Sequence, residues 1–315
     1  MATPSTYLDF EKPLAELETK IAELETAGGD AIDDEVVKLR EKAAKQLEHI
    51  YSHLNAWQKT QVARHPDRPH FMDYVETLFE EFVELAGDRK FMNDDAILGG
   101  LARFRGKPVV VIGHEKGRDT ATRLKHNFGM GKPEGYRKAV RLMEMAGRFG
   151  LPVIALVDTS GAFPGKGGEE RGQAEALARS IEACLTLDTP MISVIVGEGG
   201  SGGAVALASG NKVLMMEHAV YSVISPEAGA SILFRTPDKA AEMAEAMKTT
   251  AQDLLALGVI DRIVPEPVGG AHREPALAAQ TLVEAIHGEL DKLSELSPDQ
   301  LRAAREERFL RIGDS

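Results

Sequence analysis

Residues 191–204 read MISVIVGEGGSGGA, and the rest of the chain is organised around this stretch. Six mostly apolar, partly β-branched residues predict a short buried strand, and the glycines after them predict a turn with almost no side chains. Residues 204–208, AVALA, are expected to open a helix. A strand, a bare turn and a helix start leave several backbone N–H groups unpaired, and such a turn can hold an anion or an oxyanion.

One motif on this turn is the dinucleotide-binding pattern G-x-G-x-x-G. Gly197, Gly199 and Gly202 fit it, with Glu217 in the place of the ribose-binding acid. The residues between Gly203 and the next predicted strand, VLMME, are too few for a βαβ crossover, which needs about 10–12 residues. This mismatch weighs against a dinucleotide site.

Three other interpretations of the turn stay open at this point. Gly199, Ser201 and Gly203 fit G-x-S-x-G, the nucleophile elbow of serine hydrolases. Residues that could complete a catalytic triad follow in the required order, namely Asp261 and then His272 or His287. Alternatively, the backbone of Gly202-Gly203 forms an oxyanion hole without any side-chain nucleophile. The fourth interpretation is that the glycines only allow tight packing against a neighbouring backbone.

Composition narrows the class of protein. The 315 residues are 43% apolar and 27% charged, as in ordinary globular proteins. Lys+Arg 37 minus Asp+Glu 49 gives −12, which argues against a general nucleic-acid or membrane-surface binder. No apolar run approaches the roughly 18 residues of a membrane span, and no secretory signal is recognised. We therefore expect a cytoplasmic protein.

Metal and disulfide chemistry are not expected. Cys184 is the only cysteine, which excludes disulfides within the chain and cysteine-rich zinc sites. It lies in an apolar helical pattern, SIEACLTL, and is interpreted as a buried structural thiol. His65 and His70 are close in sequence, but no third ligand has a suitable spacing. The sequence thus predicts no metal site.

Residues 1–63 are predicted to form a helical extension. Leu14, Leu17, Ile21 and Leu24 follow helical spacing, AGGD breaks the pattern, and DDEVVKLREKAAKQLEHIYSHL resumes it. An antiparallel hairpin of this kind needs a surface to pack on, so either a solvated helix pair or a docking element for a partner subunit is expected. Residues 64–315, in which no linker is recognisable, are predicted to form one domain.

The larger part of the chain alternates strands and helices. Residues 75–87, VETLFEEFVELAG, predict an amphipathic helix ended by its glycine, and two strands joined at residues 105–107 follow. The second of these strands begins near Val109, and further strands begin near Val153 and Ile192, with helices between the three. This pattern predicts an α/β fold with a largely parallel sheet.

Two further segments are candidates for the functional site. Residues 158–165, DTSGAFPG, follow their strand as the glycine turn follows its own, so both turns are expected to border one site at the carboxyl ends of the strands. Residues 116–132 are locally basic, which suits either the phosphates of a small ligand or a solvated loop. Their basic residues are Lys116, Arg118, Arg123, Lys125 and Lys132.

These segments together resemble a known family. The chain is similar to the alpha subunits of bacterial acetyl-coenzyme A carboxylase carboxyltransferase. The matching segments occur in the family's order between about residues 8 and 265: LDFEKPLAELETKI, RHPDRP, FEEFVELAGDR, VIGHEKGRDT, NFGMGKPEGYRKAVRLM, DTSGAFPG, EERGQAEALA, GEGGSGGA and YSVISPE. The family commonly has DTPGAYPG, whereas this chain has Ser160 and Phe163. Because neither change touches the backbone N–H groups of Gly161 and Ala162, activity is expected to survive.

The resemblance implies a crotonase-like fold, a spiral of ββα units, with an N-terminal helical extension. It also implies transfer of a carboxyl group from carboxybiotin to acetyl-CoA, giving malonyl-CoA for fatty acid biosynthesis. The implied partners are a beta subunit with a zinc ribbon, in an α2β2 heterotetramer, together with biotin carboxylase and the biotin carboxyl carrier protein. No metal is expected in this chain, and no nucleic acid or membrane is expected as a partner.

The resemblance also assigns residues. Two backbone oxyanion holes, Gly202-Gly203 and Gly161-Ala162, would hold the biotin oxygen, and the beta subunit would supply most of the acetyl-CoA site. Residues expected around the substrates are Gly199, Gly200, Ser201, Phe163, Lys116, Arg118 and Lys125. Two alternatives from other classes remain: a hydrolase with Ser201 as nucleophile, and a non-catalytic scaffold that only positions the beta chain.

Overall fold

One mixed sheet forms the centre of the molecule. The computed structural model describes residues 6–27 and 30–313, and the strands found there form a single sheet in the order β1-β2-β3-β4-β5-β6-β8, with β7 paired to β5. The strands are β1 (Glu80–Glu84), β2 (Ile97–Phe104), β3 (Lys107–His114), β4 (Val153–Thr159), β5 (Met191–Gly200), β6 (Lys212–Met216), β7 (Val220–Ser222) and β8 (Arg262–Val264).

The strands from β3 to β8 are parallel, as the alternating pattern predicts. β3 pairs with β4, β4 with β5, β5 with both β6 and β7, and β6 with β8, all in parallel. The first three strands are antiparallel. The predicted turn between β2 and β3 is confirmed, and Arg105 and Gly106 both have positive φ, as a two-residue hairpin turn of type I′ requires.

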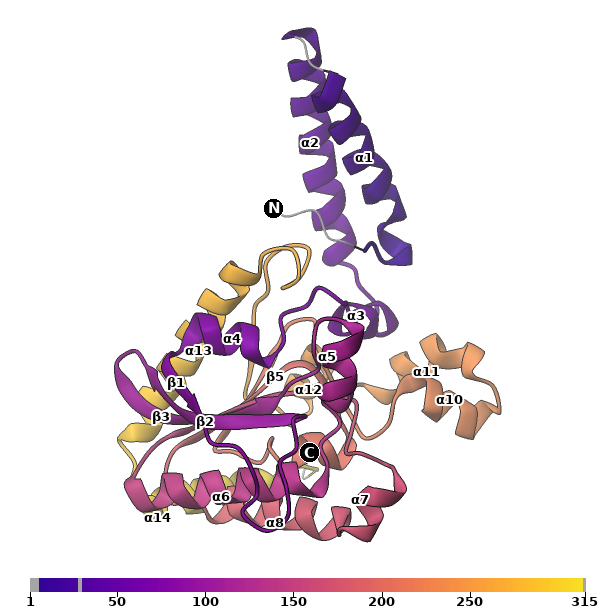
Figure 1. The fold of residues 1–315 in the computed structure, drawn as a ribbon. Coiled ribbons are helices and arrows are strands. Elements are labelled where there is room, and N and C mark those ends of the chain that lie inside the picture. Colours follow the sequence, from indigo (N-terminus) through magenta and orange to yellow (C-terminus); the bar gives the residue numbers. More distant parts are fainter. Residues whose placement is uncertain (1–5, 28–29, 314–315) are drawn as a thin grey trace.

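Helices cover both faces of the sheet (Figure 1). Helices α6, α8 and α14 lie along one face, and α4 and α13 lie along the other. The helices of the body are α3 (Ala56–Ala63), α4 (Phe71–Leu78), α5 (Thr120–Lys125), α6 (Pro133–Phe149), α7 (Lys166–Glu170), α8 (Gln173–Thr186), α9 (Ser201–Val205), α12 (Ala251–Ala256), α13 (Pro275–Ser294) and α14 (Pro298–Leu310), with the 3₁₀ turn η2 (Asn127–Gly129). The buried apolar residues of β3, β4 and β5 form the centre of the core.

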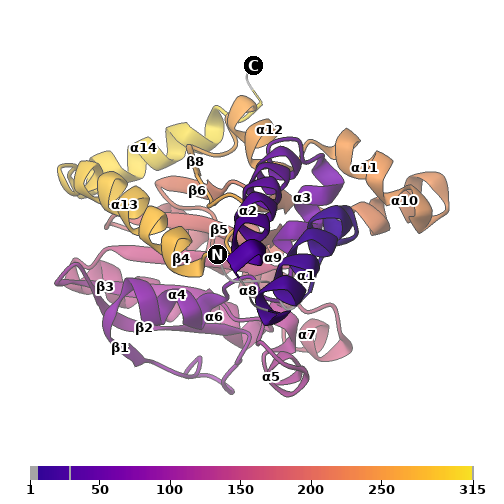
Figure 2. The ribbon, with the colours of Figure 1, turned by 90° about the horizontal axis from the view of Figure 1, so that it is seen from above.

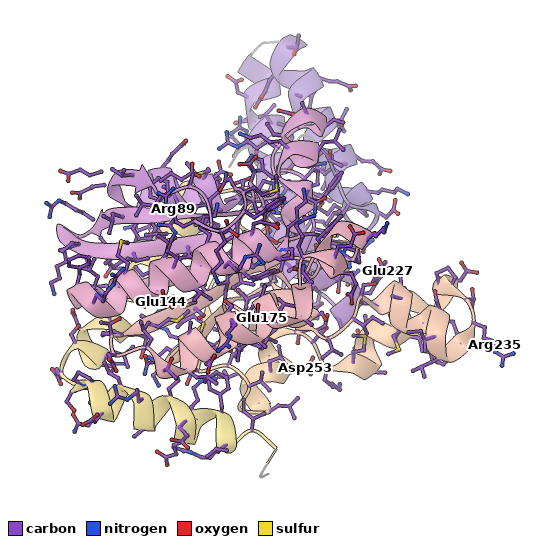
Figure 3. The ribbon with its side chains drawn as sticks, turned by 60° about the horizontal axis from the view of Figure 1, so that its bottom comes forward. Arg89, Glu144, Glu175, Glu227, Arg235 and Asp253 are labelled. Carbon is purple, nitrogen blue, oxygen red and sulfur yellow. The ribbon has the colours of Figure 1, made fainter. Side chains whose placement is uncertain are left out.

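Two helical pairs project from this body. The predicted N-terminal helices are present as α1 (Lys12–Ala27) and α2 (Asp30–Tyr51), preceded by the short turn η1 (Asp9–Glu11), and they stand above the body side by side (Figures 1 and 2). Their facing side chains form a small apolar cluster of their own. The second projection consists of α10 (Pro226–Phe234), η3 (Pro237–Lys239) and α11 (Ala240–Met247), with Glu227 near the body and Arg235 at the outer end (Figure 3).

The helix predicted over residues 75–87 is wrong in its second half. Helix α4 ends at Leu78, and Glu80–Glu84 form the edge strand β1. The register of β1 shifts between Glu80 and Val83, where Glu81 has a φ of +52°, as in a β-bulge. The extra residue places Phe79, Phe82 and Leu85 against the core at a spacing of three. That spacing imitates a helix in the sequence.

The predicted glycine turn is also shorter than expected. Gly197, Gly199 and Gly200 belong to strand β5, which continues to pair with β7, and helix α9 begins at Ser201 rather than at Ala204. In the strand, a Cβ on Gly199 would lie 2.8 Å from the ring of Tyr221. The interpretation as close packing therefore holds for the strand glycines. Only Gly202 and Gly203 lie in the turn that opens the helix.

The described residues contain neither a helix that could span a membrane nor a cluster of side chains that could hold a metal ion. In residues 6–27 and 30–313, no helix combines the length and the apolar character needed to span a bilayer. Within the same ranges, no group of three or more His, Cys, Asp or Glu side chains is arranged to hold a metal ion.

Candidate active site

The two predicted turns lie side by side. Strands β4 and β5 are parallel neighbours in which Thr159 is opposite Gly199, so the chain leaves both strands at the same edge of the sheet. The contact between the turns depends on glycine. A Cβ on Gly203 would lie 2.6 Å from the backbone nitrogen of Ala162, and a Cβ on Gly200 would lie 2.2 Å from the carbonyl of Ser160. The close approach of these backbones leaves no room for a side chain.

The backbone N–H groups at this contact differ in their bonding. Gly161 donates to the Thr159 hydroxyl at 3.1 Å, whereas the N–H of Ala162 has no hydrogen-bond partner within the described residues. Gly202 and Gly203 lie in the first turn of α9, where N–H groups lack the acceptor four residues back in the helix. Ala162, Gly202 and Gly203 are therefore the donors available to a ligand oxygen.

A cavity borders each turn. A polar cavity of about 360 Å³ is lined by Ser160 of the first turn. An apolar cavity of about 390 Å³ is lined by Ser201 at the start of α9 and extends between β7 and α11. The other residues that line the polar cavity include Arg64, His70, Lys116, Arg123, Phe128 and Glu198. Those of the apolar cavity include Val205, Tyr221, Val223, Ile224, Met243 and Met247.

The residues of a serine hydrolase triad are not brought together. Ser201 is exposed, with a φ of +50°. Asp261 accepts hydrogen bonds from the N–H of Val213 and from Arg308. The two histidines lie elsewhere: His272 stacks on His65 at 3.9 Å between ring centres, and His287 is paired with Asp291. Neither of the two histidines that the sequence order allows is therefore paired with Ser201 as a base.

The dinucleotide motif is likewise not in its structural context. Helix α9 has five residues, and Glu217 accepts a hydrogen bond from the N–H of Glu266 at 3.0 Å. A dinucleotide fingerprint needs a full helix between two parallel strands.

The basic residues of the predicted segment lie in different environments. Lys116 contacts Asp158 at 2.7 Å and Glu198 at 2.8 Å. Arg118 pairs with Asp73, and Lys125 is exposed on α5. Of these three, Lys116 is the one held at strands β4 and β5, whereas Arg123 lines the polar cavity with Ser160, and Lys132 lies near the ring of Phe163.

Buried ion pairs surround Lys116. Burial opposes its charge, but the carboxylates of Asp158 and Glu198 outweigh that effect and raise the pKa of the lysine. The same contacts lower the pKa of Asp158 and of Glu198 against the opposite effect of their own burial. Arg64 extends the group, since it donates to Glu198 at 2.6 Å and to Glu227 at 2.5 Å. The directions of these pKa shifts keep Lys116, Asp158 and Glu198 charged at neutral pH.

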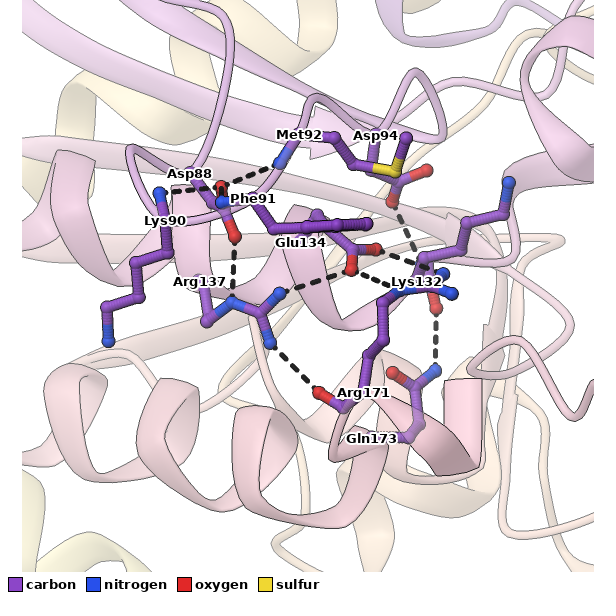
Figure 4. Close-up of polar contacts among 11 residues, drawn as sticks. Asp88, Lys90, Phe91, Met92, Asp94, Lys132, Glu134, Arg137, Arg171 and Gln173 are labelled. Carbon is purple, nitrogen blue, oxygen red and sulfur yellow. Dashed lines mark hydrogen bonds and ion pairs between the residues drawn. The ribbon is translucent and has the colours of Figure 1, made fainter. Parts of the chain in front are cut away.

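A second polar network holds the Phe163 end of the first turn. The N–H of Phe163 donates to the carbonyl of Gly131, and the side-chain amide of Gln173 donates to the same carbonyl and to that of Phe163. Figure 4 shows Gln173 together with the neighbouring group of Glu134, Arg137 and Arg171. Glu134, fully buried at the start of α6, accepts from Arg137 and Arg171. The aromatic ring of Phe163 lies 5.6 Å from the ammonium of Lys132. The turn is thus anchored on both sides of Ala162.

Several of these residues were not singled out from the sequence. Asp158 stands in the quoted motif DTSGAFPG, and Glu198 stands in GEGGSGGA, but each was treated as part of a glycine turn. Arg64 is the first residue of the motif RHPDRP, and His70 follows the motif directly. The sequence does contain one signal for such a residue: Asp158 follows the apolar strand residues VIALV. A charged residue at the end of a buried strand indicates a polar partner nearby, since a buried charge requires one.

Comparison with known proteins decides the family. A family model described as "Acetyl co-enzyme A carboxylase carboxyltransferase-like" matches residues 7–313. An acetyl-coenzyme A carboxylase carboxyl transferase subunit alpha from Erythrobacter litoralis (strain HTCC2594) is 65% identical over 312 residues, which cover 98% of this chain and 99% of that relative. The chain belongs to the acetyl-CoA carboxylase carboxyltransferase alpha-subunit family. Another alpha subunit, from Caulobacter vibrioides (strain NA1000 / CB15N), is 61% identical over 311 residues, covering 98% and 97% of the two chains.

Solved structures support the fold of this alpha-subunit family. The beta subunit of geranyl-CoA carboxylase from P. aeruginosa has a TM-score of 0.58 at 15% identity, covering 79% of this chain and less than half, 46%, of its own. The Pseudomonas malonate decarboxylase MdcD-MdcE heterodimer has a TM-score of 0.55 at 18% identity, covering 69% of this chain and 90% of its own. The predicted crotonase-like fold is confirmed. Membership of the family makes the chain a carboxyltransferase subunit and implies a complex with a beta subunit.

Proposed function

We propose that this chain takes part in the transfer of a carboxyl group from carboxybiotin, carried by a separate protein, to acetyl-CoA. The observation that carries the proposal is the close contact between two glycine-dependent turns, one of which has a backbone N–H group, that of Ala162, without a partner among the described residues. The unpaired N–H of Ala162 and those of Gly202 and Gly203 suit an oxygen that gains negative charge. The reaction is inferred from the family, and the role of this chain in the reaction is inferred from these residues.

The turn residues fit the carbonyl of biotin. Its ureido oxygen is an acceptor, and Ala162 offers an N–H with no other partner within the described residues. When bound, carboxybiotin supplies the carboxyl group. The amides of Ala162, Gly202 and Gly203 would hold that oxygen, and each such donor contributes about 2.7–4 kcal/mol of transition-state stabilisation in enzymes with oxyanion holes. The N–H of Gly161 would orient the turn through Thr159 rather than bind the ligand.

The apolar cavity beside Ser201 would take the non-polar part of the biotin, and the polar cavity beside Ser160 would face the charged end of the reaction. We propose that Gly199 and Gly200 shape the approach to the amides, because their missing side chains keep β5 close to β7 and to the first turn. The beta subunit would hold most of the acetyl-CoA, whose methyl group becomes an enolate when it loses its proton.

The N-terminal hairpin is proposed as the docking element for the beta subunit. On this proposal the chain divides into an extension, residues 1–63, and a carboxyltransferase domain, residues 64–315. The base of the hairpin is held by the body, where the buried Arg273 pairs with Glu11 and Glu18. Val37, farther along α2, is 55% exposed. Val37→Glu should weaken assembly with the beta subunit, whereas Phe149→Glu, at the exposed end of α6, should leave it unchanged.

Formation of malonyl-CoA from acetyl-CoA and carboxylated biotin tests the proposal, with and without co-purified beta subunit. We expect activity only in the complex, because this chain supplies half of a two-substrate site. Ser201→Ala should keep most of the activity and Gly203→Val should abolish it. Complete loss in Ser201→Ala would favour a hydrolase-like nucleophile. Normal turnover of an intact Gly203→Val complex would favour a scaffold that contributes no catalytic group.

A further inference from the structure

Lys116 joins the carboxyl ends of three neighbouring strands. It follows β3 by two residues, and its ammonium lies 2.7 Å from a carboxylate oxygen of Asp158 in β4 and 2.8 Å from one of Glu198 in β5. The side chains of Lys116, Asp158 and Glu198 are 15%, 3% and 12% exposed. One buried cation therefore connects the two strands that lead into the catalytic turns.

The contact is reinforced by the backbone. The same oxygen of Asp158 that contacts Lys116 also accepts the N–H of Glu198 at 2.8 Å. Gly197 allows this approach, because a Cβ there would lie 2.5 Å from that oxygen. The other carboxylate oxygen of Glu198 is held by Arg64 at 2.6 Å. Lys116 and Glu198 are thus each held by more than one contact. Residues that set the spacing between two strand ends need to be fixed in this way.

Each end of the contact is one or two residues from a turn. Thr159, next to Asp158, accepts the N–H of Gly161 through its hydroxyl and donates that hydroxyl to the carbonyl of Gly161 at 2.7 Å. On the other side, Glu198 is two residues before Gly200, which packs against the carbonyl of Ser160. A shift of either strand end would therefore move the amides of Ala162 and Gly203 relative to each other.

We propose that Lys116, with Asp158 and Glu198, is a positioning clamp that sets the spacing of the two turns and does not bind the phosphates of CoA. This proposal rests on the proposed function, because it assigns to the clamp the alignment of the amides that act on the ligand oxygen. A phosphate at Lys116 would compete with two ionised, buried carboxylates that already hold the ammonium. The guanidinium of Arg123, which also lines the polar cavity, donates to the carbonyl of Gly117 and to no carboxylate among the described residues, and is better placed to meet an anion.

The test compares Lys116→Met with Lys212→Met, each in the complex with the beta subunit. Lys212 pairs with Asp261 at 3.5 Å and begins β6 opposite Ile192, at the amino ends of the strands, so it is a matched lysine at the end of the strands away from the turns. Lys116→Met should lower kcat roughly 10- to 100-fold, since small displacements of catalytic groups have effects of that size. The KM for acetyl-CoA should stay within about twofold, as expected for a loss confined to the transition state.

Hydrogen exchange of backbone amides gives a readout that is independent of activity. In Lys116→Met, the peptides covering residues 158–163 and 198–203 should exchange faster than in the wild type, and in Lys212→Met they should not. If Lys116→Met does not assemble, the double variant K116M/D158N removes the buried carboxylate of Asp158, which would otherwise lose its lysine partner, and allows the same measurement. Asp158→Asn combined with Lys116→Met should lower kcat no further than the worse single variant, since the residues act as one unit.

Unchanged exchange in both segments would overturn the clamp. A raised KM for acetyl-CoA with unchanged kcat and unchanged exchange would instead make Lys116 a substrate contact. Failure of the proposed function would be recognised separately, because the wild-type complex would then form no malonyl-CoA while the exchange measurement still reports on the clamp.

Discussion

Gly203 and Ala162 come from different strand ends, yet a Cβ on Gly203 would lie only 2.6 Å from the backbone nitrogen of Ala162. This single contact brings two segments about forty residues apart in sequence to one point, where the N–H of Ala162 is left without a partner among the described residues. The contact requires glycine for a steric reason, because the neighbouring atoms are backbone and cannot rotate away. The catalytic role that we propose for these turns therefore depends on the geometry of the main chain and not on a side chain.

Tyr136→Phe should not reduce stability. The hydroxyl of Tyr136 is buried without a hydrogen-bond partner in the described residues and lies 2.9 Å from the position of a Cβ on Gly203. Removing an unpaired hydroxyl loses no bond, so the free energy of unfolding should change by less than about 1 kcal/mol. Tyr51→Phe is the control, because Tyr51 donates to the buried Glu11 at 3.0 Å and its loss should cost about 1.5–3 kcal/mol. Urea unfolding measures both, and a larger loss in Tyr136→Phe would contradict the assignment.

Ser201→Gly should be more stable than Ser201→Ala. Ser201 has a φ of +50°, a left-handed conformation that costs a residue with a Cβ about 1–2 kcal/mol. Glycine relieves this strain but loses about 0.5–1 kcal/mol through its flexibility when unfolded, so a net gain of about 0.5–1 kcal/mol over alanine remains. Thermal unfolding of the two variants checks the difference. Equal stability would show that the strain is not relieved at this position.

Asp94→Asn should change the pH dependence of stability. Burial raises the pKa of Asp94 to about 6, although the N–H groups of Lys132 and Ala96 donate to its carboxylate. Because the folded pKa lies above the unfolded value of about 3.9, this group stabilises the fold below pH 4 and loses that contribution as pH rises towards 6. The free energy of unfolding of Asp94→Asn, relative to the wild type, should therefore rise by about 2–3 kcal/mol from pH 4 to pH 7. A constant difference across that range would exclude the raised pKa.

Glu11→Gln should loosen the base of the N-terminal hairpin. Glu11 is fully buried, where it accepts from Tyr51 and pairs with Arg273 at 3.2 Å. Removing one member of a buried ion pair typically costs 3–5 kcal/mol, but Arg273 keeps Glu18, so a loss of about 2 kcal/mol is expected. The exposed pair of Glu25 and Arg40 provides the control, since Glu25→Gln should cost less than about 1 kcal/mol. Hydrogen exchange in α1 should rise in Glu11→Gln alone.

Much of the fold was predictable because its strands and helices repeat with clear periods. The strands near Val109, Val153 and Ile192, the turn at 105–107 and the two N-terminal helices are found where the sequence places them. The edge strand β1 was missed because the bulge at Glu81 gives its apolar residues the spacing of a helix. The local sequence pattern cannot distinguish a bulged edge strand from a helix, because it is the pairing with β2 that makes this segment a strand.

The site was predictable only in its backbone. The glycine motif indicated where unpaired amides would gather, because a helix start after a strand leaves them free. The contacts of Lys116 with Asp158 and Glu198 join residues far apart in the sequence, so no spacing rule indicates them. The sequence of the basic segment therefore leaves a phosphate contact and a solvated loop equally open, whereas in the structure its first lysine, Lys116, is held by two carboxylates.

The most direct test of the central claim compares kcat for carboxyl transfer in Gly203→Ala and Gly202→Ala complexes. Each variant adds one methyl group and keeps the backbone N–H. At Gly202 the new Cβ would meet only the side chain of Leu177 at 3.4 Å, whereas at Gly203 it would meet the backbone of Gly161 and Ala162. Amide stabilisation predicts a loss of at least about 100-fold in Gly203→Ala and less than about tenfold in Gly202→Ala. Equal activity of the two variants, in complexes of normal composition, would contradict the account.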